Sequence, residues 1–142
     1  MKLVCHLLDS KGRDIVSIAP DASVLDAIRL MSDRGIGALV VMDGDSLAGI
    51  LTERDYARKV ILKGRASDAT EVREIMTTDV ITTTSSESVD KCMNTVTEKR
   101  IRHLPVVDEG RLIGIISIGD LVKAIISDQQ QAIEQLEHYI SG

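Results

Sequence analysis

The chain has 142 residues, of which 44% are hydrophobic and 27% charged, so it is long and apolar enough to bury a core. Its net charge of −5 and its lack of Trp and Phe argue against nucleic-acid binding, which needs cationic surface and aromatic stacking platforms. No secretory leader pattern opens the sequence and no apolar run is long enough to span a bilayer. We therefore expect a cytoplasmic protein with no membrane partner.

The two cysteines predict neither a disulfide nor a zinc site. Cys5 and Cys92 are far apart and belong to no C-x-x-C motif. Cys92 falls on the apolar face of a predicted helix, where a small buried thiol is expected. Cys5 and His6 could form half of a metal site, but no second pair of ligands exists in the sequence. We expect no bound metal.

The first half of the chain predicts one β-α-β-β-α unit. Its elements, in order, are a β-rich run (Ile15–Ile18), a helix with apolar residues at three- and four-residue spacing (Val24 to Met31), strands Ala38–Met42 and Leu47–Leu51, and a helix from Thr52. Ser23 and Asp26 resemble a capping box at the first helix. Asp43-Gly44-Asp45 between the two strands is a hairpin signal.

The second half repeats this pattern. Asp14–Gly64 aligns with Asp79–Gln129 without gaps at an offset of 65 positions, with many identical or similar residues. The matching elements are a run at Val80–Thr83, a helix from Val89 to Val96, strands Leu104–Val107 and Leu112–Ile116, and a helix from Ser117. Chance would not preserve one register over so long a stretch, so the chain is a duplicated module.

The repeat predicts the domain organisation. We expect domains at residues 10–64 and 79–128, a linker at 65–78 containing a helical turn at Val72–Thr77, and a C-terminal helical extension at 129–142. One unit is too small to cover both faces of its sheet, so the two copies should pack together with pseudo-twofold symmetry. The apolar stripe within Ser127–Ile140 could cover the chain's own core or a partner subunit, and we lean slightly towards a partner.

The repeated element with chemical content is the end of the second core strand. Thr52 and Ser117 each follow an apolar strand and begin a helix, with Asp55 and Asp120 three positions later. A helix N-terminus and a hydroxyl group suit a phosphate, and a carboxylate can accept both hydroxyls of a ribose. The same spacing also describes a capping box with no other role, and Asp55 could simply pair with Lys59. Spacing alone favours capping, but the two roles can coexist.

A second cluster precedes the core strand of the second copy. Arg100, Arg102 and His103 could bind a phosphate oxygen, whereas the aligned stretch from Gly35 to Ala38 carries no charge. A solvated basic edge is an equally good interpretation of this cluster. Arg54, on the first turn of the helix after Thr52, could also reach a phosphate.

Together these features resemble a pair of CBS domains, also called a Bateman module. The resemblance rests on the two copies, the linker Val72–Thr77, the Leu104-Pro105-Val106-Val107-Asp108 strand, and the stretches Gly49–Asp55 and Gly114–Asp120. It covers roughly residues 10–128. The chain is similar to small bacterial stand-alone CBS-pair proteins, although Val40 stands where that family often has proline.

The resemblance implies a mixed α/β fold of two tandem β-α-β-β-α repeats and an adenosine-containing ligand. In the family the motif Asp holds ribose, the Thr or Ser contacts phosphate or ribose, basic residues reach phosphate, and aliphatic residues of the first strand enclose adenine. The predicted nucleotide-binding residues are Asp55, Asp120, Thr52, Ser117, Arg54, Arg102, His103, Ile15, Val16, Ser17, Ile18, Val80, Ile81, Thr82 and Pro105.

The resulting functional hypothesis is a regulatory module that binds AMP, ADP, ATP or a dinucleotide such as NAD(H). We expect it to act as a homodimer and to control an unidentified partner protein. The alternative is a protein-interaction scaffold whose nucleotide clefts are vestigial. An enzyme is not expected, because the sequence offers no nucleophile–base pair, metal cluster or carboxylate dyad.

Overall fold

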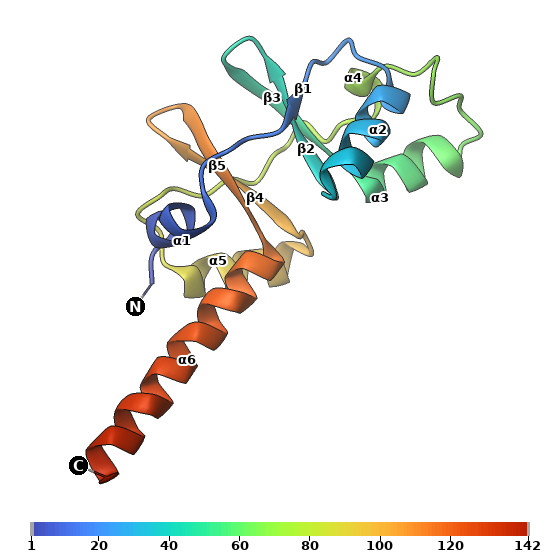
Figure 1. Cartoon of the computed structure of the whole chain (residues 1–142). Coiled ribbons are helices and arrows are strands. Elements are labelled where there is room, and N and C mark those ends of the chain that lie inside the picture. The colour runs from blue at the N-terminus through green and yellow to red at the C-terminus, as the bar shows by residue number, and fades with distance from the viewer. Residues whose placement is uncertain (1, 142) are drawn as a thin grey trace. The chain divides into compact units, whose positions relative to one another are not determined.

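The computed structural model describes residues 2–141 and divides them into two compact units. One comprises residues 15–81 and is called here the Asp55 unit. The other comprises residues 2–14 together with 82–141 and is called the Asp120 unit. Each contains a β-hairpin with helices, so the predicted mixed α/β fold is confirmed (Figure 1).

The Asp55 unit contains a three-stranded sheet in the order β1-β2-β3, with β1 parallel to β2 and β2 antiparallel to β3. Its elements are β1 (Ser17–Ile18), α2 (Val24–Arg34), β2 (Ala38–Asp43), β3 (Ser46–Thr52), α3 (Glu53–Tyr56), a π-helical continuation at Ala57–Ile61, and α4 (Val72–Ile75). Of the capping box predicted here, the structure shows one bond: Ser23 caps α2 by accepting a hydrogen bond from the Asp26 amide at 3.1 Å.

The core of the Asp55 unit is aliphatic, as the composition requires. It is formed by buried residues of α2, both strands of the hairpin, the π-helical segment and α4: Val24, Ala27, Met31, Leu39, Val41, Leu51, Val60, Val72 and Ile75. The helical turn predicted in the linker therefore has a packing role, because α4 covers the core of this unit.

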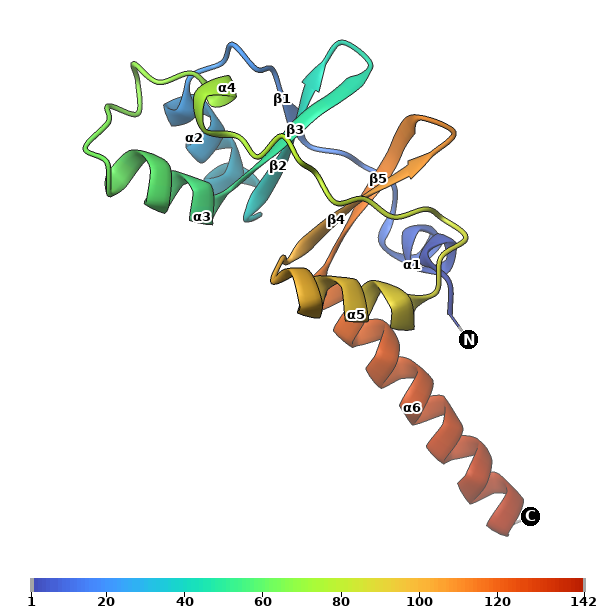
Figure 2. The same ribbon diagram turned by 180° about the vertical axis from the view of Figure 1, so that it is seen from behind.

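The Asp120 unit is built around an antiparallel hairpin. Its elements are α1 (Val4–Lys11), α5 (Val89–Lys99), β4 (His103–Asp108), β5 (Arg111–Ser117) and α6 (Ile118–Ser141). Ser88 caps α5 by accepting from the Lys91 amide at 3.1 Å. Figure 2 shows α5 lying alongside the first turns of α6, where Leu121 and Ala124 are buried.

The predicted β-rich runs are shorter in the structure than expected. Only Ser17 and Ile18 of the first run form a strand, and the second run makes a single parallel bridge from Thr83 to Val106. The expected strand over Val80–Thr83 is therefore wrong. Each run has a neighbouring strand on one side only. It forms a continuous hydrogen-bonded ladder only where consecutive residues pair with that strand. Cys92 is buried in α5, as predicted.

The helix α1 was not predicted, and it takes on the Asp120 unit the place that α4 takes on the Asp55 unit. Leu3 bridges Ser88 as Glu71 bridges Ser23. A Cβ atom added to Gly114 would lie 2.7 Å from Leu8. Its counterpart on Gly49 would lie 2.9 Å from the Met76 sulfur. Each hairpin thus carries a glycine where a helical segment packs against the strand.

Candidate functional site

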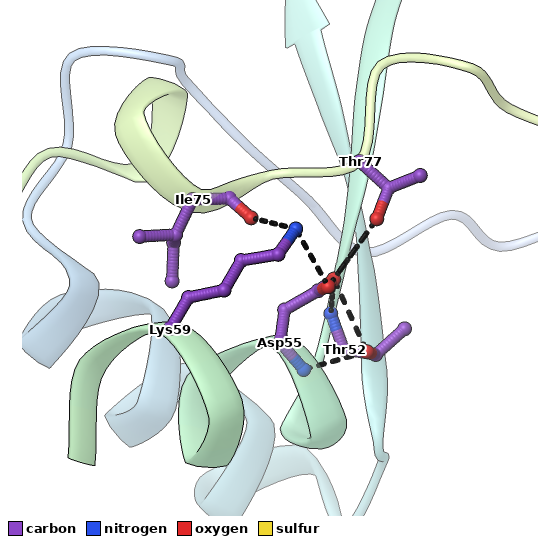
Figure 3. Close-up of polar contacts among 5 residues, drawn as sticks. All are labelled: Thr52, Asp55, Lys59, Ile75 and Thr77. Carbon is purple, nitrogen blue, oxygen red and sulfur yellow. Dashed lines mark hydrogen bonds and ion pairs between the residues drawn. The ribbon is translucent and has the colours of Figure 1, made fainter. Parts of the chain in front are cut away.

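In the Asp55 unit, the motif at the end of β3 forms a capping box. The Thr52 hydroxyl accepts from the Asp55 amide at 3.1 Å, and Asp55 Oδ2 accepts from the Thr52 amide at 3.1 Å. The Thr52 hydroxyl also lies 3.1 Å from Asp55 Oδ2 (Figure 3). The capping interpretation of this motif is confirmed.

The Asp55 carboxylate has further partners beyond the cap. Lys59 Nζ lies 3.1 Å from Asp55 Oδ1 and donates to the Ile75 carbonyl at 2.9 Å. The Thr77 hydroxyl donates to both carboxylate oxygens at 3.3 and 3.4 Å. The side chain of Asp55 is only 11% exposed, and Figure 3 shows these groups surrounding it. This carboxylate therefore joins β3, α3 and the linker.

In the Asp120 unit, the equivalent motif makes the same cap but has a different cationic partner. Asp120 Oδ2 accepts from the Ser117 amide at 2.8 Å, and the Ser117 hydroxyl accepts from the Asp120 amide at 3.1 Å. Lys11, at the last turn of α1, donates to the same Oδ2 at 2.6 Å and to the Ile115 carbonyl at 2.9 Å. Asp120 is 21% exposed, about twice the exposure of Asp55.

The environment of Asp120 favours its charged form. Burial alone would raise the pKa of Asp120, but the hydrogen bonds from Lys11 and Ser117 and the positive charge of Lys11 outweigh that effect. The pKa of Asp120 therefore lies below its ordinary value of 3.8. At neutral pH this group is a carboxylate and accepts hydrogen bonds only.

The predicted basic residues lie beside the cap of α6. His103 is paired in register with Ser117 across the hairpin, and the Arg102 carbonyl accepts from the Ile118 amide at 2.8 Å. The Arg102 side chain is exposed and that of His103 half-buried. Arg100, by contrast, adopts a left-handed conformation with φ of 55° and caps the end of α5. In the Asp55 unit the positions of Arg102 and His103 are taken by Gly37 and Ala38, so the two sites differ in charge.

The other predicted residues have varied surroundings. Ile15 and Val16 are half-buried and precede β1, at the edge of the sheet where β2 begins and β3 ends. Ser17 is exposed and Ile18 half-buried in β1, while Arg54 is exposed on α3. Val80 and Ile81 end the Asp55 unit and Thr82 begins the following segment of the Asp120 unit. Pro105 is buried in β4, where its carbonyl accepts from Thr83.

Sequence reasoning missed two polar partners of the motif carboxylates. Thr77 belongs to the linker, which was read only as a helical turn, and Lys11 lies 109 positions before Asp120. Thr77 also exchanges two backbone hydrogen bonds of 2.9 Å with Ile50, the counterpart of Ile115. In the Asp120 unit the Lys11 ammonium therefore contacts both β5, at the Ile115 carbonyl, and the Asp120 carboxylate. In the Asp55 unit Thr77 makes the equivalent contacts, with Ile50 of β3 and with Asp55. No repeat signal could have identified it.

Within residues 2–141 we find no group of three or more His, Cys, Asp or Glu side chains placed to hold a metal ion. No helix of this range is both long and apolar enough to cross a bilayer.

Comparison with known proteins identifies the family. The profile of the CBS domain matches residues 11–62 and 72–127. The chain is 42% identical to the mitochondrial CBS domain-containing protein CBSX3 of Arabidopsis thaliana, over 98% of this chain and 72% of that protein. It is 29% identical to the CBS domain-containing protein YhcV of Bacillus subtilis, over 92% of this chain and 94% of that protein.

Solved structures agree with this result. A CBS-domain protein from Burkholderia ambifaria, described as a signal-transduction candidate, is 56% identical with a TM-score of 0.87, over 90% of this chain and 96% of that one. The CBS domain pair of protein MJ0100, solved with 5′-methylthioadenosine and S-adenosyl-L-methionine, is 26% identical with a TM-score of 0.80, over 90% and 98% of the two chains. The present chain belongs to the CBS-domain family and consists of a tandem pair of CBS domains.

Proposed function

We propose that this protein is a regulatory module that binds an adenine nucleotide at the site around Asp120. In this proposal Asp120 accepts the ribose hydroxyls, and Ser117 and the start of α6 face phosphate or ribose. Arg102 provides positive charge and His103 a ring N–H donor for the phosphate. The observation that carries the proposal is the convergence of an anionic acceptor, a hydroxyl and a basic pair at the adjacent ends of β4 and β5.

The chemistry of these residues matches the two halves of a nucleotide. An ionised carboxylate accepts hydrogen bonds and cannot donate, so it suits the vicinal hydroxyls of ribose. An arginine beside a helix N-terminus suits a phosphate, which carries charge and several acceptor oxygens. The enclosure of the base by Val80, Ile81 and Thr82 stays a prediction from the sequence. The adenosyl ligands bound by the MJ0100 domain pair support this ligand class.

Lys11 competes with the ribose for Asp120 but can also contribute a positive charge to phosphate binding. A ribose that takes both oxygens of Asp120 must displace the Lys11 ammonium from Oδ2. Lys11 then becomes available as a further cation for the phosphate, and its exchange between carboxylate and ligand links occupancy of the site to the position of α1. A ligand shifts such an equilibrium only by its different affinity for the two arrangements.

The site around Asp55 favours the second candidate function, a scaffold whose nucleotide cleft is vestigial. Asp55 is largely buried and already bonded to Thr52, Lys59 and Thr77. The neighbouring Gly37 and Ala38 offer no charge to a phosphate. We therefore assign Asp55, Thr52, Arg54 and the wall Ile15–Ile18 a weaker nucleotide affinity than the Asp120 site.

The remaining parts of the proposal concern activity, assembly and compartment. We propose a non-catalytic homodimer that acts on a partner protein, consistent with relatives named only for their CBS domains. AMP, ADP, ATP and NAD(H) are all candidate ligands. The cytoplasmic location stays a prediction, and the Arabidopsis relative is named as mitochondrial.

Thermal unfolding of the pure protein with each candidate ligand tests the proposal. A ligand present at 100 times its Kd stabilises the folded state by about 2.7 kcal/mol, which raises the Tm by several degrees. We expect this shift with at least one of AMP, ADP, ATP, NAD(H) and S-adenosyl-L-methionine, and a much smaller one with GMP. Native mass spectrometry of freshly purified protein should show whether a nucleotide is retained. No shift with any adenine ligand would favour the scaffold.

A further inference from the structure

The helix α6 carries an apolar stripe that continues far beyond the core of the Asp120 unit. Its buried residues, Leu121 and Ala124, lie in the first two turns, whereas residues 129–141 are exposed throughout. The stripe is formed by Val122, Ile126, Ile133, Leu136 and Ile140, which are 42–82% exposed. Figure 1 shows this half of α6 running on as a single helix. Burial in its own unit does not explain the stripe.

The spacing of the stripe identifies its complement as another helix. Including Gln129, its positions succeed one another at intervals of four, three, four, three and four residues. This alternation of four and three residues is the a/d spacing of a heptad repeat, in which two helices bury a common seam against each other. A membrane surface fits poorly, because residues 127–141 contain Asp128, Glu134 and Glu137 but no Lys or Arg.

We propose that α6 pairs with α6 of a second copy of this chain, in antiparallel orientation. The stripe is symmetric about its midpoint, so an antiparallel partner places Val122 opposite Ile140, Ile126 opposite Leu136, and Gln129 opposite Ile133. Every position of the seam then has a counterpart. The contact extends over about 27 Å at 1.5 Å per residue.

The charges beside the seam select the antiparallel orientation. Lys123 and Glu137 occupy equivalent flanking positions, two heptads apart, and both are exposed. In an antiparallel pair Lys123 of each copy faces Glu137 of the other, and the two helix dipoles oppose each other. In a parallel pair the positions facing Lys123 and Glu137 hold Ile118 and Ala132, which carry no charge.

This proposal specifies the surface of the homodimer proposed above and requires no nucleotide. Its experiment is therefore run without ligand, so that its failure and the failure of nucleotide binding are distinguished. The pairing covers fewer than three heptads, so we expect association that depends on protein concentration. A single chain has a mass of 15.5 kDa, which sets the scale for the measurement.

Sedimentation of the full chain tests the seam. The double variant Ile133→Glu/Leu136→Glu puts charges into the seam and should halve the mass of the associated species at concentrations where the wild type is assembled. The control Gln131→Glu adds charge on the opposite face of the same helix and should keep the wild-type mass. Circular dichroism checks that all chains are folded. A wild-type chain that stays monomeric at 100 µM, or a seam variant that keeps the wild-type mass, would overturn the proposal.

Exchanging the charges at Lys123 and Glu137 tests the relative orientation of the two helices and leaves the apolar seam unchanged. Lys123→Glu should weaken association several-fold, because it places a second carboxylate opposite Glu137 of the other copy. Adding Glu137→Lys to the same chain should restore the wild-type dissociation constant, since opposite charges again face each other. Equal dissociation constants for the wild type, the single variant and the double variant would contradict the antiparallel pair.

Discussion

The two motif carboxylates occupy equivalent positions in duplicated units but have different surroundings. Asp55 is held by neighbours close in its own unit, namely Thr52, Lys59 and Thr77, and is almost sealed from water. Asp120 is more exposed, and its cationic partner Lys11 lies on α1, 109 positions earlier in the sequence. Duplication thus preserved the helix cap in both copies, while the other partners of the carboxylate diverged.

This difference separates a structural role from a binding role. In the Asp55 unit the carboxylate bonds to residues of β3, the π-helical continuation of α3 and the linker, so removing it should lower the free energy of unfolding. In the Asp120 unit the carboxylate belongs to the α6 cap, beside which Arg102 and His103 lie, and its cation Lys11 is 35% exposed, so a ligand can compete for it. The same three-residue spacing therefore serves both purposes, depending on what packs around it.

The largest effect should come from filling the close contacts at the two equivalent glycines. Gly49→Ala places a Cβ 2.7 Å from the backbone carbonyl of Thr77 and should lower the free energy of unfolding by about 1–3 kcal/mol. A Cβ on Gly114 would meet both methyl groups of Leu8, at 2.7 and 3.3 Å. Because these atoms end a side chain and can shift further than a backbone carbonyl, Gly114→Ala should cost less. Chemical denaturation of both variants measures the difference. Equal losses would refute the distinction between a rigid and a yielding neighbour.

The next largest effect should come from replacing each motif carboxylate with alanine. Asp55→Ala leaves the Thr52 amide and the Thr77 hydroxyl without their acceptor in a part-buried place, which should cost about 1–3 kcal/mol. Asp120→Ala deprives the Ser117 amide of its acceptor near the surface and should cost about 1 kcal/mol. Urea unfolding of the two variants provides the measurement. A larger loss for Asp120→Ala would reverse the roles assigned to the two sites.

The sequence could predict one part of the site and not another. The register of the repeat located both carboxylates and both hydroxyls, and the i,i+4 spacing indicated the pair between Asp55 and Lys59. Lys11 could not be found in this way, because α1 lies outside the repeat and its pairing depends on the folded chain. The strand predicted at Val80–Thr83 did not form, because composition alone does not show whether a neighbouring strand can pair with every residue of the run.

A smaller effect concerns acid stability. Because the pKa of Asp120 is lower in the folded chain than its ordinary value of 3.8, the folded state binds fewer protons than the unfolded state in this range. The stabilisation by the ionised carboxylate is present above about pH 4 and is lost as the pH falls through the lowered pKa. Asp120→Asn should therefore flatten the fall of unfolding free energy below pH 4. Identical pH profiles for variant and wild type would contradict this.

The smallest expected change concerns Lys11. Lys11→Met removes the ammonium that competes for Asp120 but keeps an apolar stem on α1. The affinity for uncharged adenosine should rise a few-fold, whereas AMP should gain less because its phosphate loses a cation. Competition binding with both ligands measures the ratio. A drop in adenosine affinity would show that Lys11 supports the nucleoside and does not compete with it.

The proposed binding role of Asp120 is tested most directly by calorimetric titration of adenine nucleotide into wild type, Asp120→Ala and Asp55→Ala, each confirmed as folded. Losing a hydrogen bond to a charged group costs about 1.5–3 kcal/mol, which corresponds to a roughly 10- to 150-fold weaker Kd. We expect this loss for Asp120→Ala and a change of less than about threefold for Asp55→Ala. Unchanged affinity in Asp120→Ala, or the greater loss in Asp55→Ala, would contradict the account.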